Sequence, residues 1–338
     1  MNAKVFIATT GKGLARAERQ ANDGWSVEHM VEDQDVHCLA VDPSKRNVVY
    51  AGTQGRGMLR SDDGGRTWRR IGLDGRVVKS VAVSPHNGKT IYAGTRPACM
   101  FVSRDRGETW EELDGFRHIP WRRLWFSPAD KPFTAYVQAI GLSPADPNVI
   151  VAGIEFGAVV RSTDGGQTWS GHRPGALRDC HSLTFHATSG DWVYEAGGGG
   201  TAISRDGGKS WRQPKAGLDR RYGWAVAADP AQPEVWYASA STMSSFPKFV
   251  PAAHVDGQAN AFIFRSAGGA DWQKLGGGLP YPLDYMAYAL LTDQESPGHL
   301  YAGLANGDVW YSANYGDNWH KLALNLGGIQ RTLIMLPG

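Results

Sequence analysis

Short runs of β-branched and aromatic residues recur along the whole chain and are separated by Gly, Pro and Asn. A clear example covers residues 36–71, where the runs are VHCLAV, NVVYAGT, GMLRS and TWRRI. Runs of this length between turn residues predict β-strands. Only GLARAERQAN, at residues 13–22, has the composition of a helix, and its place in the repeat favours a strand and a turn. The pattern therefore predicts an all-β fold with four strands in each repeat.

An acidic, glycine-rich octet marks the repeat. It reads SDDGGRTW at residues 61–68 and returns as SRDRGETW, STDGGQTW and SRDGGKSW. Three weaker copies also end in tryptophan, so the series is Trp25, Trp68, Trp110, Trp169, Trp211, Trp272 and Trp319. The spacings of 43, 42, 59, 42, 61 and 47 residues give a base period near 42 with two insertions. A period of about 40–45 residues that holds four strands is typical of a β-propeller blade.

Seven copies predict a seven-bladed propeller. The segment GIQRTLIML near the C-terminus has the pattern of a first strand, and the N-terminal residues supply the other strands of that blade. We expect the N- and C-terminal strands to close the ring by sharing one blade, which removes exposed sheet edges. The predicted organisation is one domain over residues 1–338, with lid-like insertions at about 111–134 and 241–262.

The octet itself has the composition of a structural hairpin. Its glycines supply turn conformations with positive φ, and its aspartate can accept hydrogen bonds from turn amides. The tryptophan then begins the outermost strand and is large enough to fill the wedge between blades. The alternative is an acidic catalytic or calcium site. One copy in each blade cannot converge on a single substrate, so we expect a structural role.

The motif Ser-x-Asp-x-Gly-x-Thr-Trp resembles the Asp-box, or BNR repeat, and the chain is similar to seven-bladed BNR-repeat proteins over nearly its whole length. That group includes glycosyl-hydrolase-like proteins, sortilin-type receptors and a photosystem assembly factor. The resemblance implies the fold and an Asp-box that lies away from any active site. It does not imply a sialidase, because the arginine triad and tyrosine nucleophile of sialidases have no counterpart that we can place here. The xyloglucan-degrading relatives use two such domains.

The first strands of the seven repeats can be aligned, and their columns differ in kind. The third residue is always small and the fourth always aliphatic, as expected for crowded inner strands. The second residue is large and differs between neighbours: His37, Lys79, Gln138, His181, Trp224, Tyr288 and Arg331. Repetition for structure alone predicts sameness, so this column predicts an asymmetric ligand pocket at the end of the central channel. A solvated channel mouth is the alternative.

A second ring of residues is expected at the same mouth, where the second strands end. Its members are Gln54, Arg96, Glu155, Gly198, Ser241, Ala305 and Gly11, of which Gln54, Arg96 and Glu155 are large and polar. The two insertions add further candidates, of which we select Trp121 and His254, since long loops in compact domains are often functional. Aromatic and basic loop residues can stack on a sugar or clamp an acid, and they can equally pack the loop onto the propeller.

Three of these residues are the predicted catalytic groups. Glu155 is the acidic member of the two rings and the candidate general acid or base, with a salt bridge to nearby cations as the alternative. His37 and His181, three blades apart, are its candidate partners. A divalent metal held by His37, His181 and Glu155 is a further alternative, although no HxH or HExxH spacing supports it. Asp35 and Asp179, two residues before the histidines, are possible second carboxylates.

Composition limits the partners. The formal net charge of +2 and the absence of a basic run give no reason to expect nucleic acid, and no apolar stretch approaches the length of a membrane helix. Cations in both rings predict a small anionic or sugar-like substrate. Three cysteines form no paired framework, which favours the cytoplasm. The sequence thus predicts a hydrolase- or lyase-like enzyme, with a binding scaffold for a protein partner as the alternative, and leaves the oligomeric state open.

Overall fold

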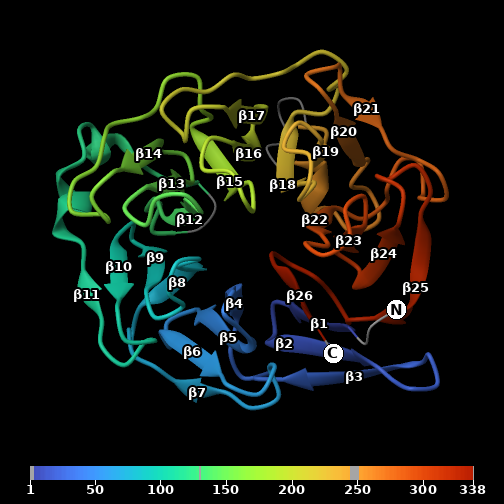
Figure 1. Cartoon of the computed structure of the whole chain (residues 1–338), viewed down its shortest axis with the longest axis horizontal. Helices are drawn as coiled ribbons and strands as arrows, with labels where there is room; N and C mark the ends of the chain where they lie inside the picture. Colours follow the sequence, from blue (N-terminus) through green and yellow to red (C-terminus); the bar gives the residue numbers. More distant parts are fainter. Residues whose placement is uncertain (1–3, 129–130, 244–250, 338) are drawn as a thin grey trace.

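The computed structural model describes residues 4–128, 131–243 and 251–337. Within these ranges helical structure is limited to three short 3-10 turns, η1 (Asp114–His118), η2 (Arg122–Leu124) and η3 (Ala252–His254). All other regular structure is β-strand, in antiparallel sheets that stand around a central axis as in a β-propeller (Figure 1). The all-β prediction is confirmed. None of the helical segments in these ranges has the length or hydrophobicity to span a bilayer.

The described strands form six hydrogen-bonded sheets. Two are β4 (Val36–Asp42), β5 (Lys45–Thr53), β6 (Met58–Ser61), β7 (Arg69–Arg70), and β8 (Val77–Val83), β9 (Ile91–Arg96), β10 (Met100–Ser103), β11 (Glu111–Glu112). The third is β12 (Val137–Leu142), β13 (Ile150–Ile154), β14 (Val159–Ser162). The fourth is β15 (Asp179–Phe185), β16 (Val193–Gly198), β17 (Gly200–Ser204), β18 (Tyr222–Ala228), β19 (Trp236–Ser241), β20 (Phe262–Ser266), β21 (Gln273–Lys274). The last two are β22 (Ala287–Thr292), β23 (Leu300–Leu304), β24 (Asp308–Ser312), β25 (His320–Asn325), and β26 (Leu333–Pro337), β1 (Lys4–Thr9), β2 (Leu14–Arg19), β3 (Trp25–Met30).

Both ends of the chain meet in one sheet. Strand β26 pairs with β1, from Lys4 opposite Pro337 to Ala8 opposite Leu333, and the sheet continues through β2 and β3. The segment GLARAERQAN supplies β2 and pairs with β1, so its strand prediction is confirmed. Leu14 packs in one core cluster and Ala15 and Ala17 in another, because both faces of this sheet are covered.

Two sheets depart from the four-strand pattern. The seven-stranded sheet consists of two strand groups that are joined by one residue pair, Gly198 opposite Tyr222. The sheet of β12–β14 lacks a regular fourth strand. There the chain bonds back at separate points, where Ser170 N–H donates to the Arg161 carbonyl at 2.8 Å and Arg173 N–H to the Val159 carbonyl at 2.8 Å.

The acidic octets are hairpins, as predicted. In the copy at residues 162–169, the Ser162 hydroxyl donates to Asp164 Oδ1 at 2.8 Å and accepts Gly166 N–H at 2.9 Å. Asp164 Oδ1 also accepts Thr168 N–H at 2.9 Å, and the Trp169 indole N–H donates to the Gly166 carbonyl at 2.9 Å. The bonds made by the serine and the aspartate recur around Asp63, Asp105 and Asp206, and the indole bond recurs at Trp68 and Trp110, whereas the Trp211 indole N–H has no hydrogen-bond partner among the described residues. The carboxylate oxygens therefore accept hydrogen bonds from the amides and hydroxyls of their own turns, which agrees with a structural role.

The first insertion packs on the propeller through η1. Phe116 is completely buried, with its ring 5.2 Å from that of Trp169 and 6.1 Å from that of Trp125. Residues 129–130 of this insertion and 244–250 of the second one lie outside the described residues. The remainder of the first insertion rises toward the mouth of the channel, where Arg96 donates to the Pro132 carbonyl at 2.7 Å.

Candidate functional site

The seven inner strands β4, β8, β12, β15, β18, β22 and β26 surround the channel, and each contacts the next (Figure 1). In β4 the register shifts between Val36 and Cys38, so His37 has no partner residue across the strand pair. Equivalent shifts occur at Lys79, Gln138, His181 and Tyr288, and one over Trp224–Ala225. A β-bulge re-aims the side chain of its extra residue. Six of the seven residues in the divergent column therefore sit on bulges that turn them toward the channel, and Arg331 precedes its strand.

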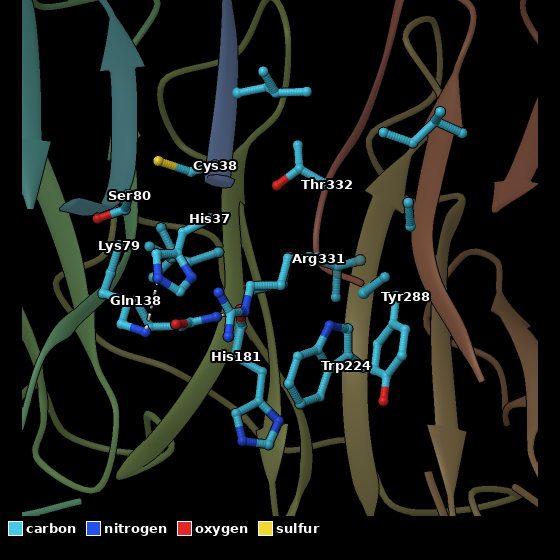
Figure 2. A pocket seen from close by; sticks show the side chains of 18 of the residues that line it. His37, Cys38, Lys79, Ser80, Gln138, His181, Trp224, Tyr288, Arg331 and Thr332 are labelled. Atoms are coloured by element: carbon cyan, nitrogen blue, oxygen red, sulfur yellow. Dashed lines mark hydrogen bonds between the residues drawn. The ribbon is translucent and has the colours of Figure 1, made fainter. Parts of the chain in front are cut away.

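One cavity of about 230 Å³ receives this whole column (Figure 2). Its lining includes His37, Lys79, Gln138, His181, Trp224, Tyr288 and Arg331. The small and aliphatic residues that follow each of them line it as well. Glycines in the second strands make room for the bulges: a Cβ on Gly52 would lie 2.6 Å from Cys38 Sγ. Cys38 and Cys180 are buried free thiols whose pKa burial raises, so they are not nucleophiles.

The wall that β4 and β8 form carries a buried cation and a histidine. Lys79 Nζ lies 3.5 Å from His37 Nε2 and 5.1 Å from the centre of the Tyr136 ring. His37 also contacts the Gln54 amide oxygen and lies 3.6 Å from Asp35 Oδ2, while its Nδ1 has no hydrogen-bond partner. Gln54, predicted for the second ring, thus fixes His37 and is not among the residues that line the cavity.

Arg331 supplies the second cation. It precedes β26 and reaches into the centre of the cavity, beside Gln138 and His181 (Figure 2). Its Nη1 is buried and has no hydrogen-bond partner. Burial lowers the pKa of the guanidinium, and the nearby Asp35 partly opposes this. A buried guanidinium with an unused donor is suited to binding an anion.

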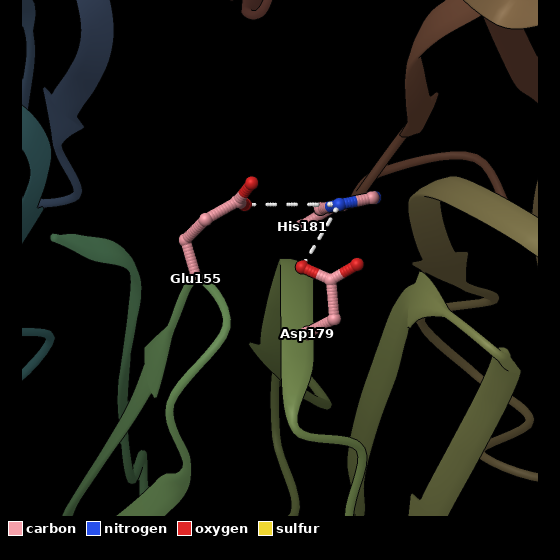
Figure 3. A group of neighbouring side chains, drawn as sticks. All are labelled: Glu155, Asp179 and His181. Carbon is pink, nitrogen blue, oxygen red and sulfur yellow. Dashed lines mark ion pairs between the residues drawn. The ribbon is translucent and has the colours of Figure 1, made fainter. Parts of the chain in front are cut away.

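At the outer end of the cavity, His181 meets two carboxylates (Figure 3). Its Nε2 lies 3.4 Å from Asp179 Oδ1 and 3.7 Å from Glu155 Oε2, and all three residues are buried. Its Nδ1 lies 2.7 Å from the Gly223 carbonyl and donates to it. The Nδ1 proton of His181 is therefore used in the hydrogen bond to Gly223, and Nε2 faces Glu155 and Asp179. A cluster of this kind needs a shared proton or another positive charge, since two buried carboxylates repel.

Proton affinities within this cluster are raised. Burial raises the pKa of Glu155 to about 7; the charges of His181 and Lys79 and a hydrogen bond from Tyr136 oppose it, and the charge of Asp179 adds to it. Burial lowers the pKa of His181, but its contacts with Asp179 and Glu155 outweigh this and raise it overall. The two carboxylates therefore favour the protonated form of His181, and near neutral pH Glu155 exchanges its proton.

The residues predicted to share a metal are not all together. Within the ranges described, Glu155, Asp179 and His181 form the one group of His, Cys, Asp and Glu side chains with ligand atoms close enough for an ion, within 4.8 Å of one another. His37 is not in that group; it belongs to the Gln54 and Lys79 wall. The group that could hold an ion therefore contains Asp179 where the sequence predicted His37.

The second insertion supports the aromatic wall of the cavity. His254 Nε2 accepts from the Tyr222 hydroxyl at 2.9 Å, and its Nδ1 donates to the Tyr288 hydroxyl at 2.9 Å. Tyr288 in turn donates to the Ala253 carbonyl at 3.0 Å. Burial and the charge of His181 lower the pKa of His254, which keeps it neutral. His254 thus lies behind Trp224 and Tyr288 and outside the cavity lining.

A separate groove of about 340 Å³ adjoins the cluster from the other side. Trp121, Trp125, Phe126 and Phe156 line it together with Leu124, Gly157, Arg178, Asp179 and Gly198. Trp121 is 79% exposed, and the rings of Phe126 and Phe156 lie 5.9 Å apart. The first insertion therefore both packs onto the propeller and exposes an aromatic side chain that could contact a ligand. Phe116 and Trp125 pack it onto the propeller, and Trp121 is open to solvent.

Comparison with known proteins agrees with this architecture. The family model for the BNR/Asp-box repeat matches residues 160–170, which is the hairpin described around Asp164. The chain carries BNR/Asp-box repeats. A search of curated proteins finds no match to this Asp-box chain.

Solved structures show the same fold at low sequence identity. An ancestral GH74 enzyme is 21% identical over 85% of this chain and 38% of its own, with a TM-score of 0.65. The GH74 xyloglucanase from Xanthomonas campestris is 18% identical over 85% and 45%, with a TM-score of 0.60. YCF48 bound to D1 peptide is 16% identical over 88% and 84%, with a TM-score of 0.58. The Asp-box chain spans less than half the length of these two GH74 proteins.

Three features of this candidate site were not predictable from the sequence pattern. The bulges leave no mark in one sequence except the small residue that follows each large one. Asp179 was named only as a possible second acid, yet it touches both His181 and the groove. Glu195, completely buried beneath the site with Oε1 unpartnered, was missed because it follows a strand pattern that predicts core.

Proposed function

We propose that the chain is a hydrolase- or lyase-like enzyme that acts on a small, anionic molecule at the mouth of its central channel. The observation that carries this proposal is the cluster of Glu155 and Asp179 around His181, which itself lines a cavity that also holds the cations Lys79 and Arg331. Lys79 and Arg331 would bind the anionic group, and Gln138, Trp224 and Tyr288 would shape the pocket.

The chemistry follows from the arrangement of protons. In a hydrolysis, the Glu155 carboxyl group donates its proton to the leaving oxygen, since its pKa of about 7 leaves about half of it protonated at neutral pH. Asp179, the second carboxylate beside His181, accepts the proton of the attacking water. The His181 imidazolium holds both carboxylates in place and stabilises the charge that Asp179 carries before it accepts the proton.

This proposal includes the architecture that the sequence predicts. We propose one seven-bladed domain over residues 1–338, closed by the pairing of β26 with β1, with the insertions at 111–134 and 241–262 beside the active site. Cytoplasmic localisation is part of it, because Cys38, Cys99 and Cys180 are free thiols.

The test is release of 4-nitrophenol from 4-nitrophenyl phosphate, acetate and glucuronide, together with thermal shifts in phosphate and in small carboxylates. An anion that binds the folded protein raises the melting temperature. We expect turnover of one substrate and a thermal shift, and we expect Arg331→Gln to reduce the shift. If no anion shifts the melting temperature and no substrate is turned over, the proposal is wrong.

The second candidate is a non-catalytic scaffold that binds a protein partner. The exposed apolar side chains of Trp121, Leu124, Phe126 and Phe156 favour it, because exposed apolar patches often mark protein interfaces. One structural neighbour, YCF48, is itself described as bound to a peptide. A scaffold predicts no turnover and no anion-dependent thermal shift, whereas Trp121→Ala would weaken binding of the partner.

A further inference from the structure

The aromatic groove and the cationic cavity meet at the same cluster of side chains. Asp179 lines the groove, and its Oδ1 lies 3.4 Å from Nε2 of His181, which lines the cavity. Gly198 keeps this junction narrow: a Cβ there would lie 2.0 Å from Asp179 Oδ2. The two hollows therefore adjoin one ion-pair cluster.

The groove presents its aromatic side chains on strained backbone. Trp121 has a φ of 64° and Phe156 a φ of 47°, in the left-handed region that bulky residues rarely adopt. Neither ring gains burial from this, since Trp121 is 79% and Phe156 40% exposed. Strained residues persist where the surrounding structure holds them, and they gather at ligand sites. Phe116 and Trp125 provide that support beneath the groove.

The lining of the groove distinguishes between kinds of ligand. Its side chains are apolar except for Arg178 and Asp179, so it offers few partners for the many hydroxyl groups of a saccharide. An aryl or alkyl group, in contrast, needs only apolar contact. The cavity on the other side offers Lys79 and Arg331 to a negative group.

We propose that the substrate is an amphipathic anion with its charged end in the channel cavity and an aryl or alkyl group in the groove of Trp121, Phe126 and Phe156. This inference rests on the proposed function and names the substrate class of the same site. The bond between the two ends of the molecule then lies against the Glu155, Asp179 and His181 cluster. Neither end alone fills the site.

Calorimetric titration of the whole chain with matched probes tests this inference. The probes are butyrate, 4-phenylbutyrate, 6-phenylhexanoate, the neutral 4-phenylbutanol and cellobiose. Of 4-phenylbutyrate and 6-phenylhexanoate, we expect the acid whose chain length fits the site to bind roughly tenfold more tightly than butyrate, because its phenyl ring is removed from water in the groove. The alcohol should bind much more weakly than the acid, and cellobiose should not bind.

Variants then assign each end of the probe. Trp121→Ala combined with Phe126→Ala should remove the advantage of the phenyl group and leave the affinity for butyrate unchanged. Tyr281→Ala, which truncates a 60% exposed aromatic outside the groove, should change neither affinity. Arg331→Gln should weaken both acids.

The outcomes separate the two proposals. If butyrate binds and the phenyl group adds nothing, the amphipathic substrate is wrong and the anion site stands. If cellobiose binds in preference to the acids, the groove is a saccharide site and the inference is wrong. If no acid binds, this inference is wrong, and the proposed function falls as well only if phosphate gives no thermal shift and no substrate is turned over.

Discussion

Nε2 of His181 lies 3.7 Å from Oε2 of Glu155. His181 comes from a bulge in β15 and Glu155 from the end of β13, so two neighbouring inner strand pairs are needed to form this contact. It joins a histidine whose other nitrogen is committed to the Gly223 carbonyl with a carboxyl group whose pKa burial raises to about 7. The proton distribution of the site depends on this pair, and the first prediction follows from it.

Replacing Glu155 with Gln should lower the turnover of any substrate found at least 100-fold, the usual scale of general acid catalysis. In the native protein Glu155 is protonated below its pKa of about 7, so activity should fall as the pH rises above 7. The variant should lack this limb of the pH profile. The control is Glu111→Gln, a substitution of an exposed surface residue paired with Arg104. A variant with native activity would exclude Glu155 as the acid.

Glu195 should make the protein less stable at alkaline pH. Burial raises its pKa from 4.5 to about 8, despite hydrogen bonds from Leu177 N–H and Cys180. The folded state therefore binds the proton more tightly than the unfolded state, and stability is lost as the pH rises from 4.5 through 8. Glu195→Gln should raise the free energy of unfolding at pH 8 by on the order of 4 kcal/mol and have little effect at pH 4. Urea titrations at both pH values measure this; equal effects at the two would contradict it.

The Asp-box hairpins should depend on an acceptor oxygen more than on charge. Asp164→Ala removes the acceptor of Thr168 N–H and should cost about 1–2 kcal/mol, as loss of a similar cap does. Asp164→Asn should cost much less, because Asn314 already fills this place in the last copy and accepts Asn318 N–H at 2.9 Å. Thermal unfolding of the two variants provides the comparison. Equal losses would mean that the negative charge is what matters.

Replacing two aromatic residues of the first insertion with alanine should affect the free energy of unfolding very differently. Phe116→Ala opens a cavity against Trp169 and should destabilise the protein by about 3–5 kcal/mol. Trp121→Ala removes a side chain that is 79% exposed and should change stability by less than about 0.5 kcal/mol. Its effect should appear only in ligand binding. A large stability loss for Trp121→Ala would show that the groove is part of the core.

The sequence by itself determined the strands, the repeat and the hairpins. These features depend on local chemistry: turn glycines, β-branched runs, and an aspartate that bonds amides four residues away in its own octet. The alignment of first strands also found the whole column that lines the cavity. A position that varies between repeats, while the positions beside it are constant, can be recognised from the sequence alone.

Only the tertiary structure decided which of these residues act together. His37 and His181 both face the cavity, but each has its own aspartate two residues earlier, and Glu155 lies with His181 alone. The bulges, the burial that sets the pKa of Glu155, and the contact of Asp179 with the groove arise between strands that are far apart in the chain. Electrostatic energies depend on distance and desolvation, and a sequence records neither.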